Sequence, residues 1–157
     1  MCSSDLCFHE FPLQGWNTWS RKELERIAIT LPGPETEILS AKARQYNCYI
    51  QFGSYAVDKD WPGHILSVTS IIGPQGQIVA RDWKARNIVG VFPGFELLTT
   101  TVYNVLDRFV EMYGADAVIP VHRTDIGNLA VSSTQLEPEL FRAMALKGAE
   151  LVLRTAT

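Results

Sequence analysis

The sequence lacks the features that would set it apart from ordinary globular proteins. Its three cysteines (Cys2, Cys7, Cys48) are odd in number and scattered, which predicts reduced thiols in a cytoplasmic protein and not a disulfide framework. No apolar run approaches the ~20 residues that span a bilayer, and we expect no signal peptide, since no basic stretch leads into an apolar one near the start. Basic residues are outnumbered, 14 against 17 acidic, which argues against nucleic-acid binding.

The composition is that of a single globular domain. The chain has 157 residues, of which 46% are hydrophobic and 20% charged, the usual balance of a folded protein. Helix and strand patterns alternate along it, with a hairpin in the middle. This order predicts an α/β fold in which outer helices cover mixed sheets.

Periodicity and turn residues give the expected elements. Helices are expected from Ser20 to 28 behind a capping box with Glu23, and over 35–46, 97–112 and 138–147. Strands are expected over 6–8, 48–57, 64–72, 77–83, 116–124, 129–133 and 150–155, with a tight turn at 73–76 and a loop over 87–94.

Both ends of the chain have the pattern of core strands. Residues 6–8 predict a buried strand almost at the first residue, and 150–155 predict another that is followed by no helix. Because a bare sheet edge leaves backbone groups unpaired, we expect a fragment of a longer protein. The alternative is a short chain with edge strands at its termini.

Three residue types suited to acyl transfer follow predicted strands. Glu10, Lys84 and Ser132, which is followed by Ser133, supply a carboxylate, an amine and a hydroxyl. In layered α/β folds, sites assemble where strands end. The carboxylate would take a proton, the nucleophile would attack, and the ammonium would stabilise an oxyanion. The alternative is that they are solvated or capping residues, which any chain of this size contains.

Metal and cofactor chemistry is not expected. His9, His64 and His122 lie far apart in the sequence and have no paired cysteines, so they do not form a zinc-ligand pattern. No phosphate-binding glycine loop and no nucleophile-elbow motif is present.

Five blocks in order resemble the carbon–nitrogen hydrolase, or nitrilase/amidase, superfamily. They are Leu6-Cys7-Phe8-His9-Glu10-Phe11 with Gly15-Trp16, Leu31-Pro32-Gly33-Pro34-Glu35-Thr36 through Ala41-Lys42, Ile72-Gly73-Pro74-Gln75-Gly76-Gln77-Ile78-Val79 into Trp83-Lys84, Thr124 through Ser132, and Pro138-Glu139 with Arg142 and Ala145 through Glu150. The last two blocks are the most specific.

The resemblance implies a fold and a set of site residues. The fold would be part of an α-β-β-α sandwich, with residues 1–157 forming one partial domain that lacks the family's N-terminal strand and helix and its C-terminal part. Glu10 would be the general base, Lys84 the oxyanion-stabilising ammonium, and Ser132 would occupy the nucleophile position. Glu96 would be the second carboxylate that holds the lysine, ahead of Asp107 and Glu111.

Two positions depart from the family pattern. His9 stands where proline usually precedes the glutamate, and Ser132 stands where the family has its cysteine. A thiol has a reference pKa of ~8.5 and forms a strongly nucleophilic thiolate, whereas a serine hydroxyl needs a strong adjacent base. The residues after Ser132 differ too, which favours a naturally altered site over a single engineered change. We expect little or no amide hydrolysis.

The resemblance also implies a function. The parent protein would hydrolyse a small amide, closer to the aliphatic amidases than to the nitrile hydrolysers, and would form a homo-oligomer in the cytoplasm, without a membrane or nucleic-acid partner. The alternatives are a non-catalytic member that keeps the fold for ligand binding or assembly, and an unrelated α/β domain.

Two geometric expectations follow. Glu10, Lys84 and Ser132 should converge in one pocket. The strand that ends at Lys84 should be a neighbour, or near-neighbour, of the strand that ends at Ser132, in a register fixed by the turn at 73–76.

Overall fold

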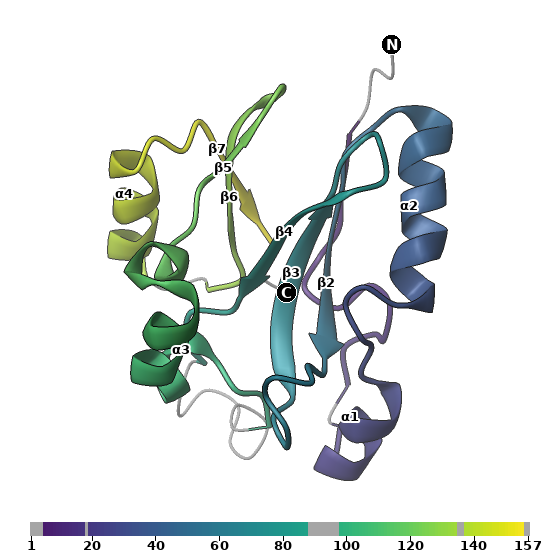
Figure 1. The fold of residues 1–157 in the computed structure, drawn as a ribbon, viewed down its shortest axis with the longest axis vertical. Helices are drawn as coiled ribbons and strands as arrows, with labels where there is room; N and C mark the ends of the chain where they lie inside the picture. The colour runs from purple at the N-terminus through teal and green to yellow at the C-terminus, as the bar shows by residue number, and fades with distance from the viewer. Residues whose placement is uncertain (1–4, 18, 88–97, 135–136, 156–157) are drawn as a thin grey trace.

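The computed structural model describes residues 5–17, 19–87, 98–134 and 137–155, which form two sheets with helices outside them (Figure 1). The first sheet has the order β1-β2-β3-β4 and the second β5-β6-β7. The strands are β1 (Leu6–Cys7), β2 (Ile50–Ala56), β3 (Leu66–Ile72), β4 (Ile78–Trp83), β5 (His122–Thr124), β6 (Gly127–Ser132) and β7 (Leu151–Arg154). The helices are α1 (Arg21–Ile27), α2 (Pro34–Tyr46), α3 (Leu106–Tyr113) and α4 (Pro138–Leu146), with 3₁₀ turns η1 (Val102–Val105) and η2 (Ala115–Val118).

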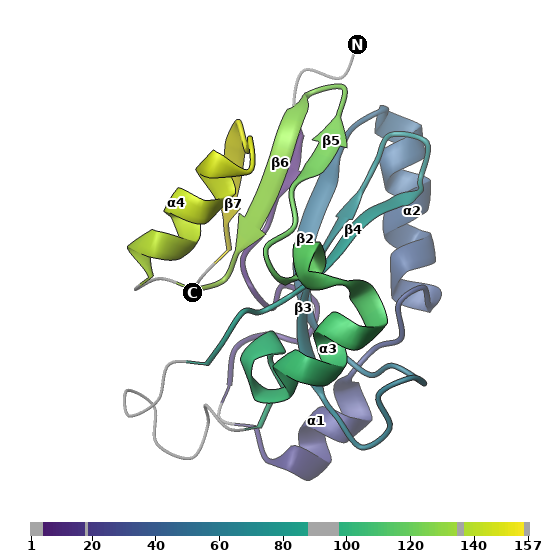
Figure 2. The same ribbon diagram turned by 60° about the vertical axis from the view of Figure 1, so that its left-hand side comes forward.

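The layers follow one another as α2, the first sheet, the second sheet and α4. Figure 1 shows α2 outside the first sheet and α4 on the far side of the second, and Figure 2 shows the same order after rotation. The β1–β2 and β6–β7 pairs are parallel, and the other pairs are antiparallel. The α-β-β-α arrangement with mixed sheets confirms the fold class expected from the sequence.

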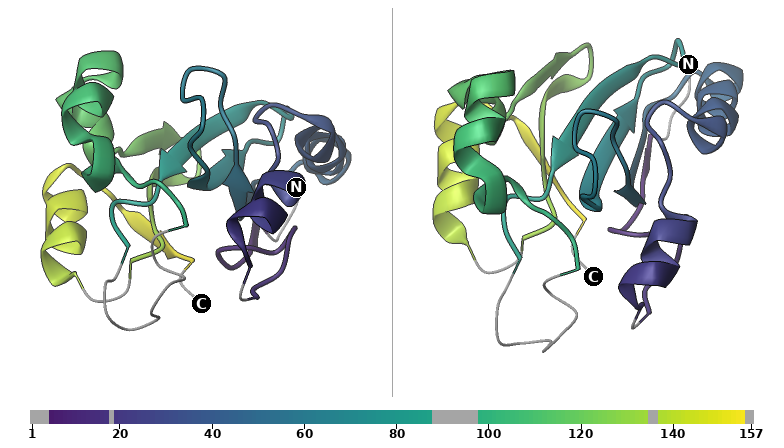
Figure 3. Two further views of the ribbon diagram at one scale, coloured as in Figure 1. Left: turned by 90° about the horizontal axis from the view of Figure 1, so that it is seen from below. Right: turned by 60° about the horizontal axis from the view of Figure 1, so that its bottom comes forward.

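Two apolar cores lie on opposite faces of the first sheet. Ala43 of α2 packs with Ile50 and Phe52 of β2 on one face. On the other face Tyr49, Ile71 and Ala80 pack against Leu129 and Val131 of β6, which closes the space between the sheets. Every residue of β2 and β3 is buried, because both faces of these central strands are covered. The view from below in Figure 3 shows the helices flanking the sheets on either side.

Local sequence signals explain the helix boundaries. Ser20 and Glu23 form the expected capping box of α1, which satisfies backbone donors of its first turn. Pro34 occupies the first turn of α2, and Asn47 ends this helix in the left-handed conformation. No helix in the described ranges is both long and apolar enough to cross a bilayer.

Several expected elements differ from the structure. Strand β1 is exposed and two residues long, not a buried strand over 6–8, because within the described ranges β2 alone pairs with it. Residues 115–118 form the 3₁₀ turn η2, so the strand expected over 116–124 is reduced to β5. The helix expected over 97–112 is η1 followed by α3. Most of the loop expected over 87–94 lies outside the described residues.

A β-bulge interrupts the β3–β4 hairpin. Ile72 pairs with Ile78, but Ile71 pairs with Ala80, so Val79 is an extra residue on β4. Such a residue shifts the alternation of side chains by one position. The side of the sheet that Lys84 faces is therefore set by the bulge as well as by the turn at 73–76.

Candidate active site

Glu10 lies in the segment that leaves β1 and packs on β2. It is 5% exposed. The His9 carbonyl accepts the Gly53 N–H at 3.3 Å, and His9 Nδ1 accepts the Phe11 N–H at 3.2 Å. A Cβ on Gly53 would stand 1.9 Å from the Glu10 carbonyl oxygen. Glycine at this position therefore allows the close approach that buries Glu10.

Lys84 follows β4 directly and is held from both sides. The backbone N–H of Lys84 donates to the Ser67 carbonyl at 2.9 Å, and the backbone carbonyl of Lys84 accepts the Val102 N–H at 3.1 Å. The Lys84 ammonium donates to Glu10 Oε1 at 2.9 Å. The two side chains are 17% and 7% exposed, so the ion pair is largely shielded from water. In such a setting each charge depends on the other for its stabilisation.

Ser67 of β3 contacts both members of this pair. Its hydroxyl donates to Glu10 Oε1 at 3.3 Å, while its carbonyl accepts the Lys84 N–H. Ser67 is buried, with 3% exposed. Both side-chain donors act on Oε1, which leaves Oε2 without a donor among the described residues. Among the described residues, the carboxylate is thus fixed through Oε1.

Tyr55 adds a buried hydroxyl near this carboxylate. Its ring stacks on Phe11 with 3.9 Å between centroids, and its oxygen has no hydrogen-bond partner in the described ranges. Burial raises the pKa of Tyr55, and the negative charge of Glu10 raises it further. Tyr55 therefore stays protonated at neutral pH.

Ser132 is the last residue of β6 and is 5% exposed. Its hydroxyl donates to the Thr134 carbonyl at 3.3 Å and accepts the Thr134 N–H at 3.2 Å. Ser132 and Lys84 both line one small cavity, to whose wall Leu140 and Met144 of α4 also contribute. Glu10 is not among the residues that line it, so Lys84 is the link between the other two positions: it bonds Glu10 and shares the cavity wall with Ser132.

The strands that carry Lys84 and Ser132 do not neighbour each other within a sheet. Strand β4 is the last strand of the first sheet, and β6 is the middle strand of the second. The expectation of neighbouring strands is wrong, because the two residues meet across the space between facing sheets. The packing of Ala80 against Leu129 and Val131 closes that space.

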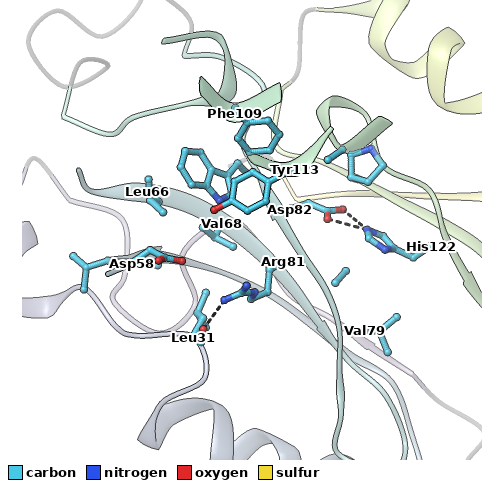
Figure 4. A pocket seen from close by; sticks show the side chains of 16 residues that line it. Leu31, Asp58, Leu66, Val68, Val79, Arg81, Asp82, Phe109, Tyr113 and His122 are labelled. Carbon is cyan, nitrogen blue, oxygen red and sulfur yellow. Dashed lines mark hydrogen bonds and ion pairs between the residues drawn. The ribbon is translucent and has the colours of Figure 1, made fainter. Parts of the chain in front are cut away.

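A buried hydrogen-bonded pair beside the cavity was not foreseen from the sequence. The Nε2–H of His122 on β5 donates to both Asp82 carboxylate oxygens, at 2.8 and 2.9 Å (Figure 4). Burial raises the pKa of Asp82, and His122 opposes that rise. The pair links the two sheets two residues before Lys84. The signal in the sequence is an aspartate in a strand whose other residues are apolar except for the exposed Arg81.

Three residues were candidates for the second carboxylate, the one that would hold Lys84. Glu96 lies outside the described residues. Its rivals Asp107 and Glu111 are both exposed on α3, as solvated helix residues are. Among the described residues, no group of three or more histidine, cysteine or carboxylate side chains is placed to hold a metal ion.

The two facing sheets between α2 and α4, with mixed strand directions, define a nitrilase-type α/β fold. The family model for carbon–nitrogen hydrolases matches residues 6–157, and the chain belongs to this family. Family members act on carbon–nitrogen bonds other than peptide bonds.

Curated relatives agree with this assignment. The chain is 33% identical over 127 residues to "Nitrilase 2" of Arabidopsis thaliana, covering 79% of this chain and 32% of that protein. It is 31% identical over 133 residues to "Bifunctional nitrilase/nitrile hydratase NIT4A" of Lupinus angustifolius, covering 83% and 32%. The chain spans about a third of the length of these relatives.

Solved structures show the same fold at lower identity. A carbon–nitrogen hydrolase from Helicobacter pylori G27 aligns with a TM-score of 0.60 and 20% identity, over 78% of this chain and 37% of that chain. An N-terminal amidase with an Asn-Glu-Ala peptide aligns with a TM-score of 0.50 and 21% identity, over 60% and 21%.

Proposed function

We propose that Glu10, Lys84 and the residue at position 132 form the reaction site of a hydrolase for small amides. The observation that carries this proposal is the shielded Lys84–Glu10 pair, whose lysine also lines the cavity that contains Ser132. A general base, a fixed positive charge and a nucleophile position are the parts that acyl transfer requires. The family membership supports the reaction class.

The proposed reaction has two halves, the transfer of the acyl group to the nucleophile and its release by water, and each of the three groups acts in both. Glu10 takes the proton of the nucleophile through Oε2, and the nucleophile forms a bond to the amide carbonyl carbon. The Lys84 ammonium stabilises the oxyanion that develops. The carbon–nitrogen bond then breaks, and the proton on Glu10 passes to the leaving nitrogen, which departs as ammonia. Water repeats the sequence on the acyl group, releases the acid and restores the site.

Ser67 acts in this proposal as a positioning residue. Its hydroxyl and the Lys84 ammonium both hold Glu10 Oε1. Oε2 is thereby kept in one place as the proton acceptor. General acid–base groups contribute about 10²–10⁴-fold to a rate when correctly placed. A misplaced Oε2 would lose much of that contribution.

The serine at position 132 sets the expected rate. A serine hydroxyl lacks thiolate chemistry, and a glutamate is a weak base for it. We propose that the chain as it stands hydrolyses amides slowly or not at all. On the resemblance and on the cysteine pattern we propose in addition a cytoplasmic location, and a homo-oligomeric state for the full-length parent.

A second function is favoured by a specific observation. Both hydrogen bonds of the Ser132 hydroxyl go to the backbone of Thr134, the role of a residue that caps a turn. A non-catalytic member of the family, which keeps the fold to bind a ligand or to assemble, would have such a serine.

Acylation of Ser132 separates the two functions. The chain is incubated with p-nitrophenyl propionate and digested, and the peptide that contains position 132 is examined by mass spectrometry. A propionyl group on Ser132 supports the hydrolase, and its absence on folded protein supports the non-catalytic member. Turnover of propionitrile without turnover of propionamide would assign the site to nitriles.

A further inference from the structure

A larger cavity lies along β4, and neither Lys84 nor Ser132 lines it. Its volume is about 280 Å³, enough for a small organic molecule. Strand β4 is the last in its sheet, and the cavity occupies the space between this strand, α3 and the segment that leads to β5. Figure 4 shows the side chains that surround it.

Aromatic and aliphatic side chains form most of the cavity wall. The rings of Trp83 and Phe109 lie 5.3 Å apart, edge to face, and those of Phe109 and Tyr113 lie 4.9 Å apart. Leu66 and Val68 of β3 add an aliphatic floor. The faces of aromatic rings attract cations as well as apolar groups.

A buried carboxylate supplies the polar part of the wall. Asp82 is 8% exposed, and the N–H of His122 is its one side-chain donor among the described residues. A carboxylate can accept about four hydrogen bonds, so Asp82 retains unused acceptor capacity. Asp58 also lines the cavity, and the guanidinium of Arg81 is bonded to the Leu31 carbonyl at 2.6 Å.

We propose that this cavity binds a small primary ammonium ion that carries a flat apolar substituent, with the ammonium on Asp82 and the substituent against the rings of Trp83, Phe109 and Tyr113. Only a donor can complete the hydrogen bonding of a buried carboxylate. A positive charge also balances the acidic side chains of the wall. This site is separate from the proposed hydrolysis of amides and does not depend on it.

Benzylamine is the probe, and benzyl alcohol is its neutral counterpart of nearly the same shape. Each is titrated into ¹⁵N-labelled protein at neutral pH, while amide shifts and the Trp83 indole shift are followed by NMR. We expect saturable shifts at Asp82, Trp83 and Tyr113. Benzylamine should bind at least about tenfold more tightly than benzyl alcohol, the ratio that a single charge-assisted hydrogen bond supplies.

Matched variants isolate the carboxylate. Asp82→Asn should weaken benzylamine binding about tenfold and leave benzyl alcohol binding nearly unchanged. Glu37→Gln removes one negative charge as well, but at an exposed position on α2. It should change the binding of neither benzylamine nor benzyl alcohol. Should Asp82→Asn fail to fold, Tyr113→Leu removes a half-exposed ring and should still weaken benzylamine binding several-fold.

Three results would overturn the proposal. The first is equal affinity for benzylamine and benzyl alcohol, which would make the cavity an apolar site only. The second is saturation that shifts residues elsewhere and not these three. The third is the absence of any shift at about 20 mM benzylamine, well above the millimolar range expected for so small a ligand.

Discussion

The Lys84 ammonium lies 2.9 Å from Glu10 Oε1, and the two residues are separated by 74 positions in the sequence. The contact joins the segment after β1 to the end of β4, at opposite edges of the first sheet's strand order. Ser67 of β3 bonds both partners from between them. The site is therefore built by the sheet and not by a flexible loop.

Removal of one partner of this pair should destabilise the protein strongly. Lys84→Met leaves the Glu10 carboxylate buried without its countercharge and should lower the free energy of unfolding by about 3 kcal/mol. The double variant Glu10→Gln/Lys84→Met should lose much less, because no uncompensated charge remains. Urea denaturation of Lys84→Met, Glu10→Gln and the double variant measures these losses. Arg142→Met, which breaks the exposed pair with Glu139, is the control and should have a smaller effect. Additive losses in the double variant would show that the two side chains are not coupled.

Gly53→Ala should test the close approach that buries Glu10. The new Cβ would stand 1.9 Å from the Glu10 carbonyl oxygen, so the backbone must move, and we expect a loss of about 1–3 kcal/mol in unfolding free energy. In Gly73→Ala the Cβ meets only the end of the Gln77 side chain, which can move aside. A larger loss in Gly73→Ala than in Gly53→Ala, by chemical denaturation, would contradict the packing described.

Asp82 should give the protein a recognisable pH dependence. Burial raises its pKa in the folded state, so its contribution to stability is fully present below the pKa of the unfolded chain and is lost as pH rises through the folded value. The Asp82→Asn variant has no carboxyl group at this position, so its unfolding free energy does not fall with pH for this reason. The unfolding free energy of Asp82→Asn minus that of the unaltered protein should therefore increase with pH through the acidic range. A difference that is flat or decreases would contradict the assignment.

Ser67 should matter through its hydroxyl. In a chain with cysteine at position 132, Ser67→Ala should lower kcat for propionamide about tenfold, because Glu10 loses one of the two donors that fix Oε1. Ser67→Thr should restore kcat, because it keeps the hydroxyl. A change in KM alone, or no rescue by threonine, would show that Ser67 has only a structural role.

The local parts of the fold were predictable from the sequence. The capping box at Ser20 and Glu23, the helix opened by Pro34 and the turn at 73–76 depend on residues a few positions apart. Their physical chemistry is contained in short segments. The position of Lys84 after a strand and that of Ser132 at the end of one follow from the same patterns.

The long-range parts were not predictable. Nothing in the pattern of β4 and β6 shows that they belong to different sheets, since facing strands and paired strands have similar apolar sequences. The bulge at Val79, which determines the face that Lys84 occupies, has no glycine or other marker. The contacts from Ser67 to Glu10 and from His122 to Asp82 join residues 57 and 40 positions apart, and ordinary serines and histidines have no local signature of such partners.

Ammonia release by the Ser132→Cys variant is the most direct test of the proposed hydrolase site. The variant and the unaltered chain are incubated with propionamide, and Glu10→Gln and Glu37→Gln are each added to the variant as test and control. We predict that cysteine raises ammonia release by about 10²-fold or more, that Glu10→Gln removes about 10²–10⁴-fold of the rate, and that Glu37→Gln leaves it unchanged. A folded Ser132→Cys protein that releases no ammonia, or whose rate is indifferent to Glu10→Gln, would contradict the account.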